Sequence, residues 1–185
     1  QAALDGIAAF PDSPRAHLML AFVMEALGEW EPALEAAESA LSREPSLVDA
    51  HLLRARLMFS LGRPAESEGA IRTALWLTPD SSEAYRIYAR LLAEYDRSVA
   101  ALECCERALA LEPDRADLHR LRAELLLQVS PYRWRISEEA AKQALRIEPN
   151  SAHNLAILGT IKMLALDYAA AEGLFRQALR LAPTN

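Results

Sequence analysis

The sequence predicts an all-α fold built from repeated helix pairs, and three observations lead to this prediction. Small residues recur at one period, as do the prolines, and the apolar residues within each period are spaced by three and four, as on a helix. No alternating run of β-branched residues is long enough to predict a strand. The prolines are Pro11, Pro45, Pro79, Pro113, Pro149 and Pro183, in steps of 34, 34, 34, 36 and 34. The small residues are Ala21, Ala55, Ala89, Ala123 and Gly159.

Each period divides into two predicted helices. Gly28 and Gly62 lie between the two helical runs of their units, where a residue that tolerates positive φ can end a helix. The recurring proline cannot continue the second helix, so each unit ends there. Polar residues then precede each new first helix and are candidate N-caps. These candidates are Ser13, Ser46, Ser81, Asp114 and either Asn150 or Ser151.

A helical hairpin of 34 residues with small residues at the helix crossing and a terminal proline resembles the tetratricopeptide repeat. The resemblance implies a right-handed superhelical solenoid of antiparallel helix pairs, continuous over residues 1–185 as a single array. Residues 1–11 resemble the second helix of a truncated repeat, so we expect the sequence to be a fragment of a longer protein. The full repeats are expected at residues 14–47, 48–81, 82–115, 116–151 and 152–185.

Composition argues against several classes of partner. The chain has 26 acidic and 20 basic residues, and its net charge of −6 disfavours nucleic acid and anionic lipid. Its longest uncharged stretch, residues 149–161, is far shorter than the roughly 20 apolar residues that span a bilayer, so no membrane insertion is predicted. Cys104 and Cys105 are neighbours and cannot join distant segments, which is compatible with a reducing, cytoplasmic compartment.

The sequence contains no recognisable catalytic, cofactor or metal motif. His17, His51 and His119 occupy equivalent positions in three repeats. Packed helices lie about 8 to 10 Å apart, which is too far for these imidazoles to share a zinc ion. We therefore predict no enzymatic activity, no cofactor and no metal, and we expect one buried and one partly exposed cysteine.

A binding surface is predicted on the first helices, because the resemblance implies that they line a concave groove for an extended peptide or a helix. Guanidinium groups on three successive first helices could fork onto the carboxylates of an acidic peptide, beside an apolar patch. The competing interpretation makes these arginines solvated partners of Glu83, Glu94, Asp117 and Glu124 on their own helices. The candidate partner-binding residues are Leu18, Met19, Phe22, Leu52, Arg56, Phe59, Arg86, Arg90 and Arg120.

The predicted function is a non-enzymatic scaffold for protein–protein interaction, with a protein or peptide partner. One alternative is a self-association module that builds a homo-oligomer through the repeat ends. Another is a regulatory or substrate-presenting arm of an enzyme whose catalytic domain lies outside this sequence. Trp76 and the segment around Tyr132 are further candidate contacts, whereas Trp134 is expected to pack in the core.

Overall fold

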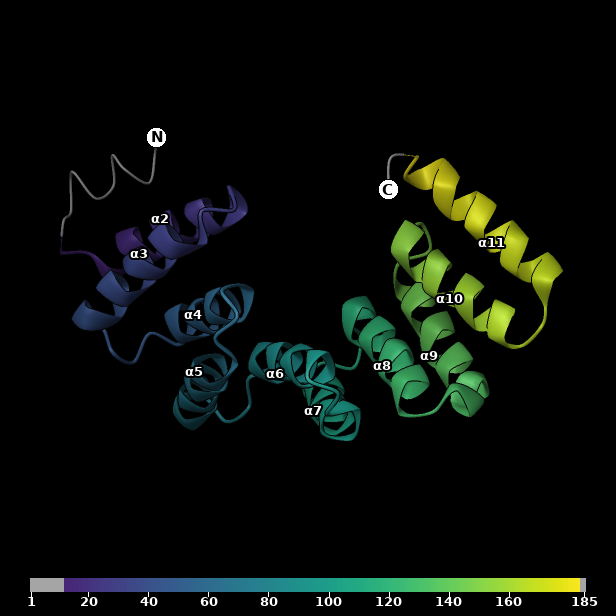
Figure 1. Cartoon of the computed structure of the whole chain (residues 1–185), viewed down its shortest axis with the longest axis horizontal. Coiled ribbons are helices and arrows are strands. Elements are labelled where there is room, and N and C mark those ends of the chain that lie inside the picture. The colour runs from purple at the N-terminus through teal and green to yellow at the C-terminus, as the bar shows by residue number, and fades with distance from the viewer. Residues whose placement is uncertain (1–11, 184–185) are drawn as a thin grey trace. The chain divides into compact units, whose positions relative to one another are not determined.

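A computed structural model describes residues 12–183, and every regular element in that range is helical. The all-α fold class is therefore confirmed. Figure 1 shows the helices following one another as antiparallel pairs. The first helices of the pairs are α2 (Pro14–Ala26), α4 (Val48–Ser60), α6 (Ser82–Glu94), α8 (Ala116–Val129) and α10 (Ala152–Leu164). The second helices are α3 (Trp30–Arg43), α5 (Pro64–Leu77), α7 (Ser98–Leu111), α9 (Trp134–Ile147) and α11 (Tyr168–Leu181).

The first helices begin at residues 14, 48, 82, 116 and 152, so they keep the steps of the proline series. The fourth repeat is two residues longer, and it carries a short 3-10 helix, η1 (Pro131–Arg133), between α8 and α9. The orphan helix predicted at residues 1–11 lies outside the described residues. Helix position along the rest of the chain thus follows the proline register.

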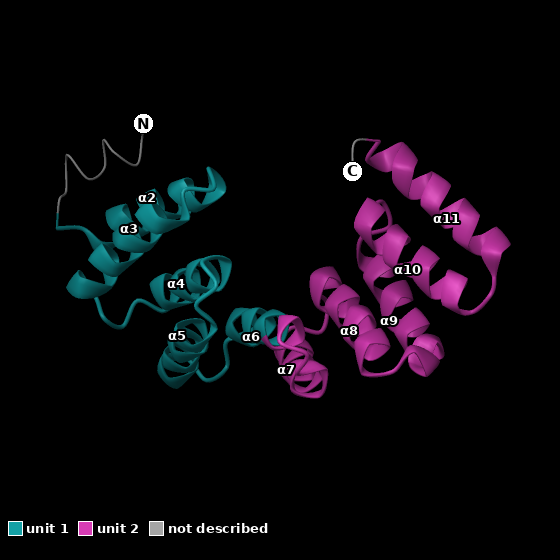
Figure 2. Ribbon diagram, in the orientation of Figure 1, with its two compact units in different colours: residues 1–91 teal, residues 92–185 magenta. Residues whose placement is uncertain are grey.

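The chain divides into two compact units, residues 1–91 and residues 92–185, with the boundary inside α6 (Figure 2). In the first unit, α2, α3 and α4 share one apolar core, and α4, α5 and α6 share another. In the second unit, α8, α9 and α10 surround a core that includes Leu126, Leu158 and Ile161. Each core therefore joins one helix pair to the first helix of the next pair.

Small residues occupy the crossing between the two helices of a repeat. Ala55 on α4 and Ala123 on α8 are fully buried. The buried hydroxyl of Ser67 on α5 donates to the carbonyl oxygen of Ala55 at 2.7 Å, and Ser137 on α9 donates likewise to Ala123 at 2.7 Å. The small side chains therefore let the two helices approach closely, and the buried hydroxyl group of each serine still makes a hydrogen bond.

The N-caps agree with the prediction in three repeats and differ in two. The hydroxyls of Ser13, Ser81 and Ser151 accept hydrogen bonds from the backbone amides three residues later. Prediction of Ser46 and Asp114 as caps was wrong, because the cap positions of α4 and α8 hold residues 47 and 115, which make no side-chain cap bond. In both helices the N-cap position lies one residue beyond the predicted polar side chain. A carboxylate in the first turn of each helix offers the N-terminal amides favourable negative charge instead.

In four repeats, the turn between the two helices contains a residue with a positive φ, in the left-handed region of backbone conformation. Gly28 and Gly62 have φ values of 78° and 70°, which confirms their predicted role. Asp96 and Leu166 adopt the same region with φ values of 55° and 62°. The turns therefore keep a positive φ at Asp96 and Leu166, although a side chain makes this conformation unfavourable.

Two of the equivalent histidines connect successive repeats. His51 donates from Nε2 to the carbonyl oxygen of Pro45 at 2.8 Å, and His119 donates to that of Pro113 at 2.7 Å. A carbonyl oxygen can only accept, so Nε2 carries the proton in both imidazoles. These histidines therefore hold the start of a first helix against the proline that ends the preceding helix.

Candidate functional site

The first unit contains a pocket of about 250 Å³ framed by its first helices, α2, α4 and α6, with α5 behind them. Three guanidinium groups and one carboxylate surround an apolar floor. Such a mixed lining fits a ligand that brings both an apolar group and negative charge. The lining residues are Glu25, Ala55, Arg56, Phe59, Ser60, Ser67, Arg86, Ile87, Arg90 and Leu91.

Helical spacing explains which side chains face this pocket. Arg86 and Arg90 are four residues apart on α6, so they lie on the same face of that helix. Ile87 and Leu91 repeat the same step one residue further along, and both are buried against the core shared by α4, α5 and α6. Helix α6 therefore supplies both a basic wall and part of the apolar floor.

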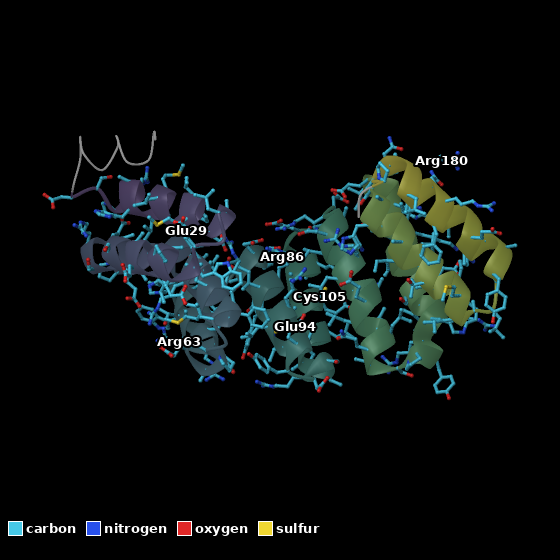
Figure 3. All side chains as sticks on the ribbon, turned by 45° about the horizontal axis from the view of Figure 1, so that its top comes forward. Glu29, Arg63, Arg86, Glu94, Cys105 and Arg180 are labelled. Atoms are coloured by element: carbon cyan, nitrogen blue, oxygen red, sulfur yellow. The ribbon has the colours of Figure 1, made fainter. Side chains whose placement is uncertain are left out.

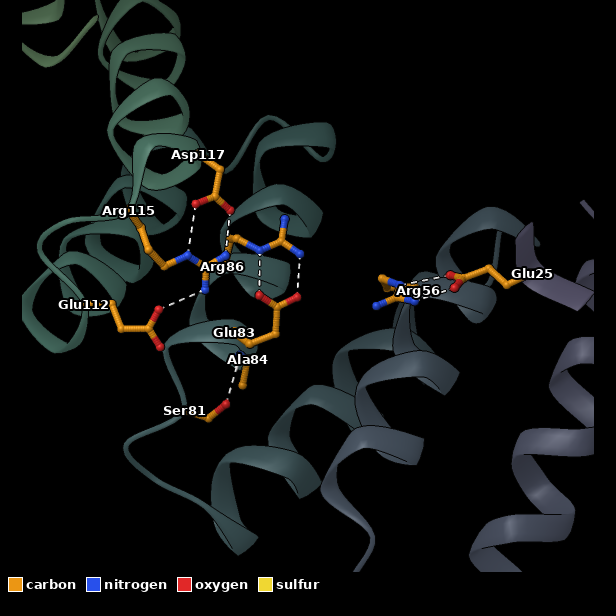
Figure 4. A network of polar contacts seen from close by, with 9 residues as sticks. All are labelled: Glu25, Arg56, Ser81, Glu83, Ala84, Arg86, Glu112, Arg115 and Asp117. Carbon is orange, nitrogen blue, oxygen red and sulfur yellow. Dashed lines mark hydrogen bonds and ion pairs between the residues drawn. The ribbon is translucent and has the colours of Figure 1, made fainter. Parts of the chain in front are cut away.

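Arg56 on α4 forms a two-point ion pair with Glu25 on α2 (Figure 4). Its Nε donates to Glu25 Oε1 at 2.9 Å, and its Nη2 donates to Oε2. The guanidinium carbon also lies 5.8 Å from the centre of the Phe22 ring, within the range of a cation–π contact. Arg56 is thus held between two groups of the preceding repeat.

The pair between Arg56 and Glu25 was not predicted, because spacing along one helix indicates only partners on that helix. The two residues are 31 positions apart, which is one repeat of 34 less one helical step of three. Adjacent first helices bring such positions together. A search for opposite charges at that separation would have found this pair.

The other two arginines of the pocket differ in their partners. Arg86 pairs with Glu83, as predicted, through Nε at 2.8 Å and Nη2 at 2.5 Å (Figure 4). The pair between Arg90 and Glu94 that the competing interpretation required is not formed, since Arg90 is exposed and has no ion pair among residues 12–183. An acidic residue that follows its basic partner by four positions has the less favourable order on a helix. Arg90 therefore offers the pocket an uncommitted positive charge.

The apolar candidates divide between core and surface. Leu18 and Leu52 are buried in the two cores of the first unit, where they stabilise helix packing. Met19 is exposed on α2, while Phe22 and Phe59 are partly buried. Met19, Phe22 and Phe59 are therefore the apolar candidates that a partner could contact. Leu18 and Leu52 instead stabilise the packing of the helices that carry these side chains.

Arg120 lies in the second unit and does not line this pocket. Its Nη1 lies 3.4 Å from Oδ1 of Asn154 on α10, and its Nε lies 3.8 Å from Glu124. Asp117, a predicted partner of Arg120, pairs with Arg115 at 2.6 Å. The predicted pair with Glu124 is present. Buried Asn154, which no sequence pattern indicated, is a further partner.

The thiols have the burial expected of packing residues. Cys105 is fully buried on α7 (Figure 3), and Cys104 is partly exposed, as predicted. Burial raises the pKa of Cys104 to about 11 and that of Cys105 to about 12. Both are protonated at neutral pH and are poor nucleophiles. The described residues also contain no cluster of three histidine, cysteine or acidic side chains placed to hold a metal ion.

Both aromatic residues that were further candidates for a partner contact are exposed. Trp76 on α5 is 80% exposed, and Tyr132 in η1 is 93% exposed. Trp134 packs against the core of the second unit, which confirms its predicted role, and Arg135 lies 5.1 Å from its ring centre. Among the described helices, none is long and apolar enough to cross a membrane.

Comparison with known proteins identifies the fold. The family model of the tetratricopeptide repeat matches residues 14–57. No curated protein sequence matches the chain. The chain therefore has the tetratricopeptide-repeat fold, with a family match of its own in the first repeats.

Three solved structures illustrate the similarity. TTC0263, a thermophilic tetratricopeptide-repeat protein of Thermus thermophilus, is 22% identical, with a TM-score of 0.81 over 94% of this chain and 93% of that one. The pilF protein of Pseudomonas aeruginosa is 20% identical, with a TM-score of 0.82 over 93% and 78%. YrrB, described as having an unusual peptide-binding site, is 14% identical, with a TM-score of 0.67 over 100% and 94%.

Proposed function

We propose that this chain, with its tetratricopeptide-repeat fold, is a non-enzymatic scaffold that binds an extended acidic peptide or helix on its first helices. The proposal rests above all on the pocket between α2, α4 and α6, where exposed Arg90 stands beside an apolar floor. YrrB, which shares the fold, is described as having a peptide-binding site, and this agrees with the proposal.

The arginines have different roles in this proposal. Arg90 receives a carboxylate of the peptide, because it is exposed and makes no ion pair with the residues that the structure describes. Arg56 and Arg86 are each held in place by a two-point ion pair, so they orient the pocket and add positive potential. An apolar side chain of the peptide then enters between Phe59, Ile87 and Leu91.

A displayed library of random peptides tests this proposal without knowledge of the natural partner. Peptides selected on the parent chain should be enriched in aspartate, glutamate and aliphatic residues. Arg90→Glu should abolish the acidic enrichment, because it places a carboxylate at the receiving position. The acidic enrichment on the parent should be strongest at low salt, where exposed charges are least screened.

Arg72→Glu is the matched control. Arg72 is a well-exposed arginine on α5 that does not line the pocket, so this change alters net charge equally. The control should select the same peptides as the parent. Acidic enrichment that survives Arg90→Glu, or that Arg72→Glu removes equally, would contradict the proposed site.

A further inference from the structure

Arg56 and Arg90 occupy the same position in successive repeats. They are 34 residues apart, and both line the pocket of about 250 Å³ in the first unit. Helices α2, α4 and α6 each have 13 residues and also begin 34 residues apart. The surroundings of Arg56 therefore show which positions of the preceding first helix a guanidinium group reaches from this place.

Arg56 reaches back to α2 and holds a carboxylate there. Its Nε and Nη2 donate to the two carboxylate oxygens of Glu25 (Figure 4). Its guanidinium carbon lies 5.8 Å from the centre of the Phe22 ring on the same helix. The internal pair is thus a two-point carboxylate site that forms between adjacent first helices.

Arg90 repeats the arginine of this internal pair without its acid. One repeat after Glu25, the chain has Phe59 on α4, whose ring has no carboxylate to accept two N–H groups. Arg90 makes no ion pair with the residues that the structure describes. One repeat after Phe22 stands Arg56, so a positive charge replaces an aromatic ring at the second neighbouring position. Both replacements favour an anion from outside the chain.

The charge balance of the pocket fits one added carboxylate. Glu25 pairs with Arg56, and Glu83 pairs with Arg86 at 2.8 and 2.5 Å. The three arginines and two glutamates therefore leave one net positive charge, which is that of Arg90. A carboxylate brings one negative charge, whereas a phosphoryl group brings nearly two at neutral pH.

The internal pair also indicates which kind of carboxylate fits. Helices α4 and α6 pack together through a shared core, so the backbone of a peptide lies over these helices and not between them. Axes of packed helices are about 8 to 10 Å apart, and Glu25 crosses such a gap with its side chain. A glutamate side chain has the reach for this contact. The carboxylate at the end of a peptide would instead have to bring its backbone into the pocket.

We infer that Arg90 binds the side-chain carboxylate of a glutamate in the peptide, with the two-point geometry by which Arg56 binds Glu25. Phe59 selects for such a ligand, because it occupies the position of the internal acid without supplying a carboxylate. This inference rests on the proposed function, and it adds the ligand residue and the residue that determines specificity.

A double-mutant cycle tests the site without any peptide. Phe59→Glu should supply Arg90 with an internal carboxylate, so Arg90→Ala should destabilise the Phe59→Glu chain more than the parent. Phe59→Gln is the matched control, since it removes the ring without adding charge. Arg90→Ala should cost that control no more than it costs the parent. Chemical denaturation measures the stabilities, and equal costs in the Phe59→Glu and Phe59→Gln chains would overturn the inference.

Peptide binding provides a second test that needs no change at residue 59. The probe is a peptide selected on the parent from the displayed library, synthesised with acetylated and amidated ends so that it has no terminal carboxylate. Replacing its glutamates by glutamine should weaken binding to the parent about tenfold, because a charge-assisted hydrogen bond is lost. The same replacement should change binding to the Arg90→Ala chain little. Aspartate in place of glutamate should also weaken binding to the parent, because its side chain is shorter.

The outcomes separate this inference from the proposed function. A parent chain that selects no acidic peptide would overturn both. Selected peptides that bind equally well with glutamine, or that bind only with a free carboxyl terminus, would overturn the inference alone. Glutamine replacement that weakens binding to the parent and to the Arg90→Ala chain by the same factor would also overturn it.

Discussion

The aromatic ring of Phe175 on α11 lies directly against Gly159 on α10. A Cβ atom added at residue 159 would be 2.8 Å from ring atom Cε1 and 2.9 Å from Cζ. The other first helices have alanine at the equivalent position, and the second helices have smaller residues such as Ala141 opposite it. The last repeat therefore exchanges a methyl group on one helix for an aromatic ring on the other.

Gly159→Ala should destabilise the chain by about 1 to 2 kcal/mol. Overpacking costs roughly 1 to 3 kcal/mol, and replacing a helical glycine recovers up to about 1 kcal/mol. Gly173→Ala is the control, because nothing lies within 4 Å of a Cβ there, and it should stabilise slightly. Chemical denaturation measures both. Equal stability of the two variants would contradict the close contact.

Leu166→Gly should raise the free energy of unfolding by up to about 1 kcal/mol, because Leu166 has a φ of 62° in the turn before α11. Its side chain is exposed, so little packing is lost. The reverse change, Gly62→Ala, should destabilise, since φ is 70° and no atom lies within 4 Å of the added Cβ. Opposite shifts in melting temperature are expected, and shifts of the same sign would argue against backbone strain as the cause.

The free energy of unfolding should fall in acid, partly because the carboxylate of Glu138 becomes protonated. Lys142 and Lys162 donate hydrogen bonds to this buried carboxylate and hold its pKa below the usual 4.5. A carboxyl with a lower pKa in the folded chain stabilises it above about pH 4.5 and loses that contribution as the pH falls through the folded value. The loss should loosen the contact between α9 and α10.

Glu138→Gln should cost about 1 to 3 kcal/mol at neutral pH and flatten the acid limb of the stability profile. Glu139→Gln is the control, because Glu139 is exposed and lies 3.8 Å from Arg146. It should change stability little. Denaturation curves between neutral pH and about pH 3 compare the three chains, and an unchanged acid limb in the Glu138 variant would exclude this carboxylate as a source of pH dependence.

Thiol reagents should modify the folded chain slowly. With pKa values of about 11 and 12, about a thousandth of Cys104 and about a ten-thousandth of Cys105 are ionised at pH 8. Both should react readily after denaturation, when burial no longer suppresses ionisation. The reaction is followed by the absorbance of the nitrothiobenzoate that thiols release from dithiobis(nitrobenzoate). A rapid native phase that Cys104→Ser removes would show that the partly exposed thiol is reactive.

The sequence by itself determined the helix pairs and their register, because their signals act locally. Proline prevents continuation of a helix, and glycine permits the left-handed turn, whatever the neighbouring repeats do. The same locality explains the error at Ser46 and Asp114. A polar residue close to a helix start predicts a cap, but a start shifted by one residue gives the N-cap position to a neighbouring residue instead.

Only the tertiary structure decided which side chains face the candidate pocket and what they contact. Glu25 holds Arg56 because neighbouring first helices approach each other, and Leu18 and Leu52 point into cores for the same reason. The competing interpretation paired Arg90 with Glu94 on its own helix, but Arg90 makes no ion pair with the residues that the structure describes. Pairing depends on distances between helices and on rotamers, and neither is encoded by spacing along one helix.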